Sequence, residues 1–235
     1  MTREAELVRA FVGLADTLVS DYDVTDFLYL LCDRCAEVLA VDAAGVLVSD
    51  EEGRLRLTSA SNERMQVLEL FEMQRLEGPC FDAYQSGTQV VHQDLASTSG
   101  KCPDFSQKAV AVGFRAVYAF PLRLRNDRMG ALNLFREDPG SFDADDVDAA
   151  QALADVATIG ILQERAVSEA QIRARHLQDA LSSRVVIEQA KGIVAERQGI
   201  DLEQAFQRLR AHARGHNRRL RALCQDVVDG ALPAP

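Results

Sequence analysis

The 235-residue sequence contains only six prolines, and it lacks any long apolar run. No proline lies between Pro139 and Pro233, so no residue in that interval forces a helix to break. No apolar run approaches the ~20 residues that a membrane-spanning helix needs. The N-terminal residues carry acids in an amphipathic pattern, which is unlike a signal peptide. We therefore expect a cytoplasmic protein without a membrane segment.

Motifs for catalysis and metal binding are also missing. The sequence has no glycine-rich phosphate loop, His-Glu metal motif or nucleophile triad. Its five cysteines are odd in number and fit reduced thiols. Cys32 and Cys35 spell CxxC, but on a helix they share an apolar face with Leu28 and Leu39, which predicts core packing. We predict no catalytic residue and no metal site, and the sequence identifies no cofactor.

Acidic side chains are absent from one stretch of an otherwise acidic chain. The formal net charge is -10, yet the residues between Gln204 and Gln225 include six arginines, two histidines and no acid. Residues 1–165 hold 15 basic and 28 acidic side chains, whereas residues 166–235 hold 11 and 8. This change of sign predicts two domains, 1–165 and 166–235. The basic domain is the candidate for a polyanionic partner, with a solvated helical surface as the alternative.

Residues 1–165 alternate between helical and strand patterns. Apolar spacing of three and four predicts helices at residues 4–20, 24–40, 62–73 and 104–112. Alternating patterns predict strands at residues 44–49, 54–60, 88–92, 115–124 and 129–136, and the rest of 78–103 reads as loops. We expect an α+β domain in which the terminal helices cover one face of an antiparallel sheet.

A single long helix is predicted from Ala144 to Gln198. Its apolar positions recur every three or four residues beyond the end of the first domain. An apolar stripe outside a domain needs a partner, most simply a second copy of the same helix. We therefore expect a homodimer formed through this linker helix.

Two further helices follow in the basic domain. The first ends at Gln198-Gly199, and Asp201 is placed to cap the second. Gly215-His216-Asn217 breaks the second helix, and Asn217 is placed to cap the third. An all-α, three-helix domain is expected.

The first domain resembles a GAF domain over roughly residues 4–165. The resemblance rests on the element order, on the FPLRLRNDRMGALNLF run from Phe120 to Phe135, and on Phe142 followed by Asp145-Asp146. It implies a sensory module that holds a small ligand on its sheet or serves as a dimerisation scaffold. Cyclic-nucleotide-binding members carry an Asn-Lys pair where this chain has Asn133-Leu134, which argues against such a ligand. The candidate ligand-binding residues are Cys80, His92, Tyr118, Phe120 and Asn133.

The second domain resembles an ANTAR domain over about residues 170–231. The matching residues are the RVVIEQAKGIVAE run at 184–196, Ala205-Phe206 with Leu209-Arg210, and Asn217 with Leu220. The resemblance implies an RNA-binding transcription antitermination regulator, which recognises paired stem-loops in transcripts under control of the GAF sensor. By the family pattern, RNA contact is assigned to Lys191 and Arg210. Gly192 also fits the pattern, and glycine within a helix costs ~1 kcal/mol relative to alanine, which indicates a close approach of a partner there. The charge pattern adds Arg208, Arg214, Arg218 and Arg219, and Ala205, Ala213 and Leu220 are given structural roles.

Three other functions stay open at this point. Cys80 and Cys102, placed in loops over the expected pocket, would suit a redox sensor or a redox enzyme, since some GAF proteins are methionine sulfoxide reductases. The basic helices would also suit a protein-interaction scaffold without RNA binding, or a DNA-binding helix-turn-helix. An enzyme has no need of the appended basic helices, so we expect a regulator and not an enzyme.

Overall fold

The computed structural model describes residues 3–19, 23–50, 52–97, 102–125 and 127–232, and it separates two compact units. The first unit comprises Met1–Arg165 and the second Ala166–Pro235. Helix α6 (Ala144–Gln198) contributes residues to both, as expected for this proline-free interval. No helix within the described ranges is long and apolar enough to cross a membrane.

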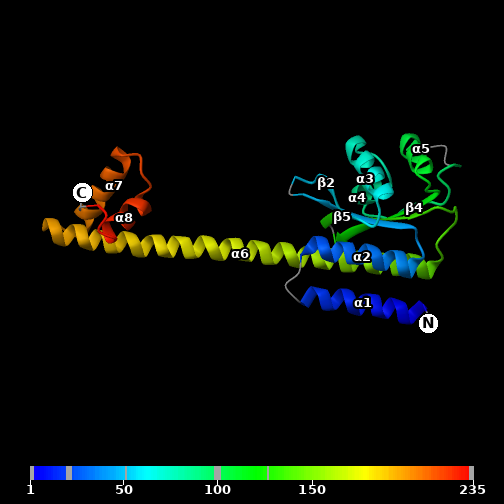
Figure 1. Ribbon diagram of the computed structural model, residues 1–235, viewed down its shortest axis with the longest axis horizontal. Coiled ribbons are helices and arrows are strands. Elements are labelled where there is room, and N and C mark those ends of the chain that lie inside the picture. The colour runs from blue at the N-terminus through cyan, green and yellow to red at the C-terminus, as the bar shows by residue number, and fades with distance from the viewer. Residues whose placement is uncertain (1–2, 20–22, 51, 98–101, 126, 233–235) are drawn as a thin grey trace. The chain divides into compact units, whose positions relative to one another are not determined.

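The first unit is built on a five-stranded antiparallel sheet with the order β2-β1-β5-β4-β3. The strands are β1 (Ala43–Ser49), β2 (Leu55–Ala60), β3 (Val90–His92), β4 (Ala116–Leu124) and β5 (Asp127–Arg136). Helices α2 (Val24–Leu39) and the first part of α6 lie along one face, with α1 (Arg3–Val19) as an outer layer (Figure 1). The opposite face carries α3 (Glu63–Arg75), α4 (Pro79–Ser86) and α5 (Pro103–Ala111) (Figure 1). The expected α+β architecture is confirmed.

The larger core lies between the sheet and the α2/α6 layer. Alternation along β4 directs Tyr118, Phe120 and Leu122 into this layer. Gly160 of α6 lets the ring of Phe27 approach closely, because an added Cβ would lie 2.4 Å from that ring. The CxxC cysteines are fully buried here, as predicted for core residues.

The stretch 78–103 is more ordered than the predicted loops. It contains α4 in place of one of the expected loops, because Gly78-Pro79 fits the start of a helix as well as a loop. Proline is favoured in the first turn of a helix, where its missing N–H costs nothing. Gly87 then ends α4 in a left-handed conformation, with φ 68°.

The second unit packs the end of α6 with α7 (Leu202–Gly215) and α8 (Leu220–Val228). Its core consists of small and medium apolar side chains on the three helices: Ala190, Val194, Ala205, Leu209, Ala213, Leu223, Cys224 and Val227. Leu220 packs against this core, so the structural roles predicted for Ala205, Ala213 and Leu220 are confirmed.

One of the two predicted caps in the second unit is wrong. Asp201 caps α7 as expected, because its carboxylate accepts a hydrogen bond from the Gln204 backbone N–H at 2.7 Å. Asn217 does not cap α8, which begins after Arg219. Asn217 instead adopts a left-handed φ of 50° and helps to end α7, a role that asparagine accepts more readily than most residues.

Candidate functional site

The exposed face of α6 and α7 in the second unit gathers two cations around one aromatic ring. Lys191 Nζ lies 5.6 Å from the centre of the Phe206 ring, and the Arg210 guanidinium carbon lies 5.8 Å from the same centre. Both distances suit cation–π contact. Lys191 comes from α6 while Phe206 and Arg210 lie one turn apart on α7, so helix packing joins residues that are distant in sequence. We name this group the Phe206 cluster.

Lys191 is held in position before any partner arrives. Its ammonium contacts the carboxylate of Glu188 at 2.9 Å, and its side chain is only 16% exposed. Arg210 is half-buried and forms no ion pair with an acid within the described ranges. The cluster therefore presents one compensated and one uncompensated positive charge.

The other arginines predicted to contact RNA differ in whether their side chains are already paired within the protein. Arg218 is paired with Asp226 at 2.5 Å, and Arg208 donates a hydrogen bond to the Gln198 side chain. Arg214 and Arg219 are exposed and join none of the ion pairs among the described residues. Arg214 and Arg219 thus remain open to an external phosphate, whereas Arg218 must first leave an acid.

Gly192 follows Lys191 directly on α6. It opens onto a groove of about 480 Å³ that also includes Glu188, Glu196 and Val228. An added Cβ at Gly192 would meet no atom within 4 Å, so no part of the described chain approaches it closely. The acids Glu188 and Glu196 make this groove unfavourable for a phosphate, and Glu188 is also the ion-pair partner of Lys191.

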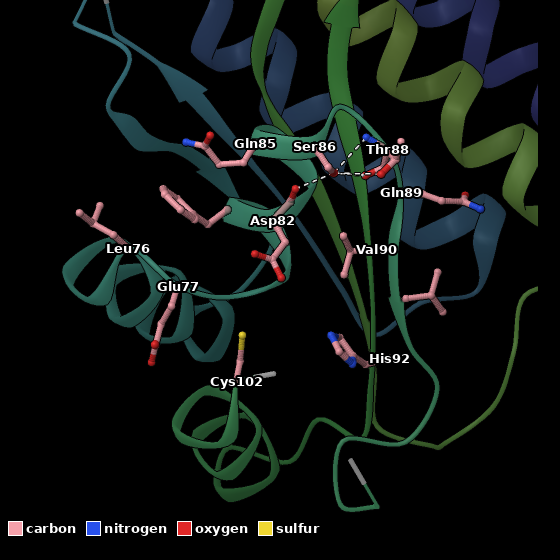
Figure 2. A pocket seen from close by; sticks show the side chains of 12 residues that line it. Leu76, Glu77, Asp82, Gln85, Ser86, Thr88, Gln89, Val90, His92 and Cys102 are labelled. Atoms are coloured by element: carbon pink, nitrogen blue, oxygen red, sulfur yellow. Dashed lines mark hydrogen bonds between the residues drawn. The ribbon is translucent and has the colours of Figure 1, made fainter. Parts of the chain in front are cut away.

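An open cleft of about 840 Å³ lies beside the edge of the sheet in the first unit. Figure 2 shows His92 of β3 and Cys102, which precedes α5, facing this space, with Glu77 and Asp82 along its wall. The remaining lining residues come mainly from α4 and the segment after it: Leu76, Phe81, Gln85, Ser86, Thr88, Gln89, Val90 and Val91. The cleft is suited to a small polar molecule, with acids more numerous than bases.

The five predicted ligand-binding residues do not line one pocket. Residue pairing between β4 and β5 sets Asn133 opposite Ala119, on the sheet face away from Tyr118 and Phe120. Tyr118 stacks on Phe142 with 3.9 Å between ring centres, and its hydroxyl donates a hydrogen bond to the Gly140 carbonyl at 2.5 Å. Tyr118 and Phe120 are therefore core residues of the α2/α6 layer.

Cys80 and Asn133, by contrast, meet at a buried group of acids that the sequence reading missed. The Asn133 amide donates to Glu69 at 2.7 Å, and the Cys80 thiol donates to Glu72 at 2.7 Å. Glu69 and Glu72 are 0% and 1% exposed. We name these four residues the buried acid cluster. Glu69 and Glu72 lie three residues apart on α3 among polar neighbours, a pattern that is typical of a helix face exposed to water. Only the packing of α4 and β5 shows that the two acids are buried.

The protonation of the buried acid cluster is strongly perturbed. Burial raises the pKa of Glu69 to about 7. Burial and the nearby charge of Glu69 raise the pKa of Glu72 well above its usual value. No basic side chain within the described residues forms an ion pair with either carboxyl group. The raised pKa values favour the protonated, uncharged carboxyl groups, because no basic side chain compensates a negative charge buried here.

Of the cysteines proposed for redox chemistry, Cys80 lies in a helix and not in the expected loop, whereas Cys102 lies outside the helices and strands, and burial favours the thiol form of both. Cys80 belongs to α4, and Cys102 occupies the position that precedes the first turn of α5. Burial, followed by the charge of Glu72, raises the pKa of Cys80, and burial raises that of Cys102. A thiol is a poorer nucleophile than a thiolate, so these environments do not favour catalytic sulfur chemistry.

Comparison with solved structures places the first unit in a common fold. The GAF domain of a phosphoenolpyruvate-protein phosphotransferase from Coxiella burnetii matches with a TM-score of 0.56 and 16% identity, over 70% of this chain and 98% of that one. The corresponding domain from Acinetobacter matches at 0.55 and 16%, over 72% and 99%. A free methionine-R-sulfoxide reductase from Neisseria meningitidis, solved with its substrate, matches at 0.54 and 17%, over 70% and 91%. At these identities the similarity shows the fold alone.

Family comparison covers both units. The GAF domain family matches residues 21–162, which is more than half of the chain, and the ANTAR domain family matches residues 175–228. No curated protein matches the chain significantly. GAF and ANTAR domains together are typical of regulatory proteins without enzymatic activity, although some proteins of the GAF fold are enzymes. The chain belongs to the GAF family and is a GAF and ANTAR domain-containing protein.

Proposed function

We propose that this protein is a transcription antitermination regulator that binds paired RNA stem-loops through its second unit. The Phe206 cluster is the observation that carries the proposal. A partly exposed aromatic ring can contact an unpaired base, while the two cations beside it contact the phosphate backbone. Arg214 and Arg219 extend the positive surface, and RNA loops present the exposed bases that duplex DNA keeps stacked.

We further propose that the first unit controls this activity as a sensor and that the protein acts in the cytoplasm, where transcripts emerge. Helix α6 supports the proposal because one uninterrupted helix contains residues of both units. The cleft in Figure 2 and the buried acid cluster offer two places for an input signal. A change at either place can alter α6 only through the core of the first unit, where Leu153 and Ala157 are buried.

The test of RNA binding is crosslinking of the full chain to cellular RNA, followed by sequencing of the bound segments. We expect adjacent hairpin pairs upstream of terminators. Affinity for such a leader should fall by ~10³ between ~50 and ~200 mM salt, because neutralised phosphates release counterions. Duplex DNA of equal length should not compete. Preferential capture of DNA, or binding that salt leaves unchanged, would contradict the proposal.

We also propose a homodimer formed through α6. Leu177, Leu181 and Val185 are 67%, 60% and 56% exposed and are spaced four residues apart, so they form one apolar stripe on α6. A stripe of this kind is stabilised when a second helix covers it.

Replacing Leu177 and Leu181 by glutamate is expected to convert the dimer to a monomer, because buried charges would oppose the helix contact. Sedimentation velocity measures the change. Affinity for a hairpin pair should fall about tenfold or more, while affinity for one hairpin stays constant, since a monomer loses the second linked contact. The control is Gln171→Glu with Gln178→Glu, which adds the same charge at exposed polar positions. Equal mass for both double variants would refute the α6 interface.

A further inference from the structure

The buried acid cluster contains more acceptor capacity than the described chain satisfies. Oε2 of Glu69, Oε1 of Glu72 and Oδ1 of Asn133 are buried and have no hydrogen-bond partner. Carboxyl groups of this burial are normally protonated, paired with a base or bound to a metal, and no base pairs with these two in the described residues. These three oxygens come from α3 and the central strand β5, so the sheet holds them in fixed positions.

The surrounding backbone is shaped to cover the acids. The turn before α4 passes so close to Glu72 that a Cβ on Gly78 would overlap its carboxyl group. Gly78 has a φ of 135°, which side chains rarely permit. The Cys80 backbone N–H also donates to Glu72. The first turn of α4 therefore closes over the acids and delivers the Cys80 sulfur to them.

The donor atoms have the spacing of a compact metal site. One oxygen from each glutamate and the Cys80 sulfur all lie within 4.8 Å of one another. Ligands bound to zinc at ~2.0–2.3 Å in a tetrahedron lie roughly 3.5 Å apart, so small side-chain movements complete such a site. The Asn133 carbonyl oxygen supplies a fourth donor if its amide rotates away from Glu69.

We propose that Glu69, Glu72, Cys80 and Asn133 bind one divalent transition-metal ion of borderline softness, such as Zn²⁺ or Fe²⁺. The sulfur ligand disfavours Ca²⁺ and Mg²⁺, which prefer oxygen ligands and larger coordination shells. The enclosed position disfavours an organic cation, which needs more room than an ion. On binding, the Cys80 S–H bond and the O–H bond of any protonated carboxyl group break, the sulfur and the carboxylate oxygens bond to the metal, and the released protons leave to solvent.

The proposed ion would connect three elements of the sensor unit. Its ligands come from α3, α4 and β5, which otherwise meet through side-chain packing and the two side-chain hydrogen bonds of the buried acid cluster. The segment that covers it, residues 76–82, supplies Leu76, Glu77, Phe81 and Asp82 to the wall of the cleft. Occupancy would therefore fix one wall of that cleft.

The test uses the untagged full chain, stripped with EDTA, and Co²⁺ and Zn²⁺ as probes. Titration with Co²⁺ should give one equivalent of binding and a thiolate-to-cobalt charge-transfer band that Zn²⁺ removes. The midpoint of thermal unfolding should rise with Zn²⁺ because the ion binds only the folded unit. Absence of stoichiometric binding by either ion would overturn the proposal.

Three variants assign the ligands. Cys80→Ser should abolish the charge-transfer band, and Glu69→Gln with Glu72→Gln should weaken Zn²⁺ binding at least 100-fold. Glutamine has nearly the same size as glutamate and has no charge to bury, so this variant should fold at least as well as the parent in EDTA, which circular dichroism checks. Cys102→Ser, a buried thiol outside the cluster, should bind like the parent. If the charge-transfer band survived in Cys80→Ser, or if the glutamine variant bound Zn²⁺ as tightly as the parent, the ion would lie elsewhere and the ligand assignment would be wrong. Metal binding is read directly, so the result is independent of RNA binding.

Discussion

Replacing Lys191 and Arg210 together by alanine is expected to weaken binding of a cognate hairpin pair about 100-fold. Each charged hydrogen bond contributes at least about 1.5 kcal/mol, and each 1.4 kcal/mol corresponds to about a tenfold change in affinity. The slope of log affinity against log salt should also become shallower by about 2, one unit for each lost phosphate contact. Filter binding over a salt series measures both quantities.

The matched control for this variant is Arg173→Ala with Arg175→Ala. These residues lie on α6, are exposed, and carry the same total charge outside the Phe206 cluster. A loss confined to the first pair assigns the contact to the cluster. Equal losses in both variants would show that net charge alone determines affinity, and the assignment of Lys191 and Arg210 would fail.

The second large effect is expected from Gly130→Ala in β5. A Cβ at this position would lie 1.9 Å from the Leu47 carbonyl oxygen of β1, a backbone atom that cannot move without separating the strands. We expect the free energy of unfolding of the first unit to fall by about 3 kcal/mol, at the upper end of ordinary overpacking. Hydrogen exchange at the amides of β1 and β5 reports this loss without interference from the second unit.

Gly13→Ala is the control in the same unit. Gly13 lies in α1, and a Cβ there would meet no atom within 4 Å. Alanine in a helix is more favourable than glycine by roughly 0.5–1 kcal/mol, so exchange should be unchanged or slower. If Gly130→Ala behaved like Gly13→Ala, the close pairing of β1 and β5 at this point would be disproved.

Periodicity predicted most elements because each buries one face. The limits of α6 were predictable from the absence of proline, and the start of α7 was predictable from Asp201 as a capping residue. Both are local properties of the sequence. Helix α4 was missed because Gly78-Pro79 fits both a loop and a helix start. The local sequence does not distinguish the helix start from the loop. The helix is favoured because it packs Cys80 and Ala83 against the sheet.

The candidate sites were less predictable because they depend on which faces meet. Lys191 and Arg210 were identified from the family pattern, but the pattern did not indicate that Phe206 lies close to both. The buried acid cluster was not predicted at all. Glutamates on a helix normally face water, and nothing within α3 indicates that Asn133, more than sixty residues later, lies opposite Glu69.

The ion pair between Lys191 and Glu188 gives the proposed RNA surface an internal competitor. The Lys191 ammonium is already in contact with the Glu188 carboxylate, so a phosphate must displace this carboxylate in order to bind Lys191. A single weakly held anion gains little from this exchange. A folded backbone that also reaches Arg210 gains enough to displace Glu188. The carboxylate thus sets a threshold that favours shaped polyanions over the abundant small phosphates of the cell.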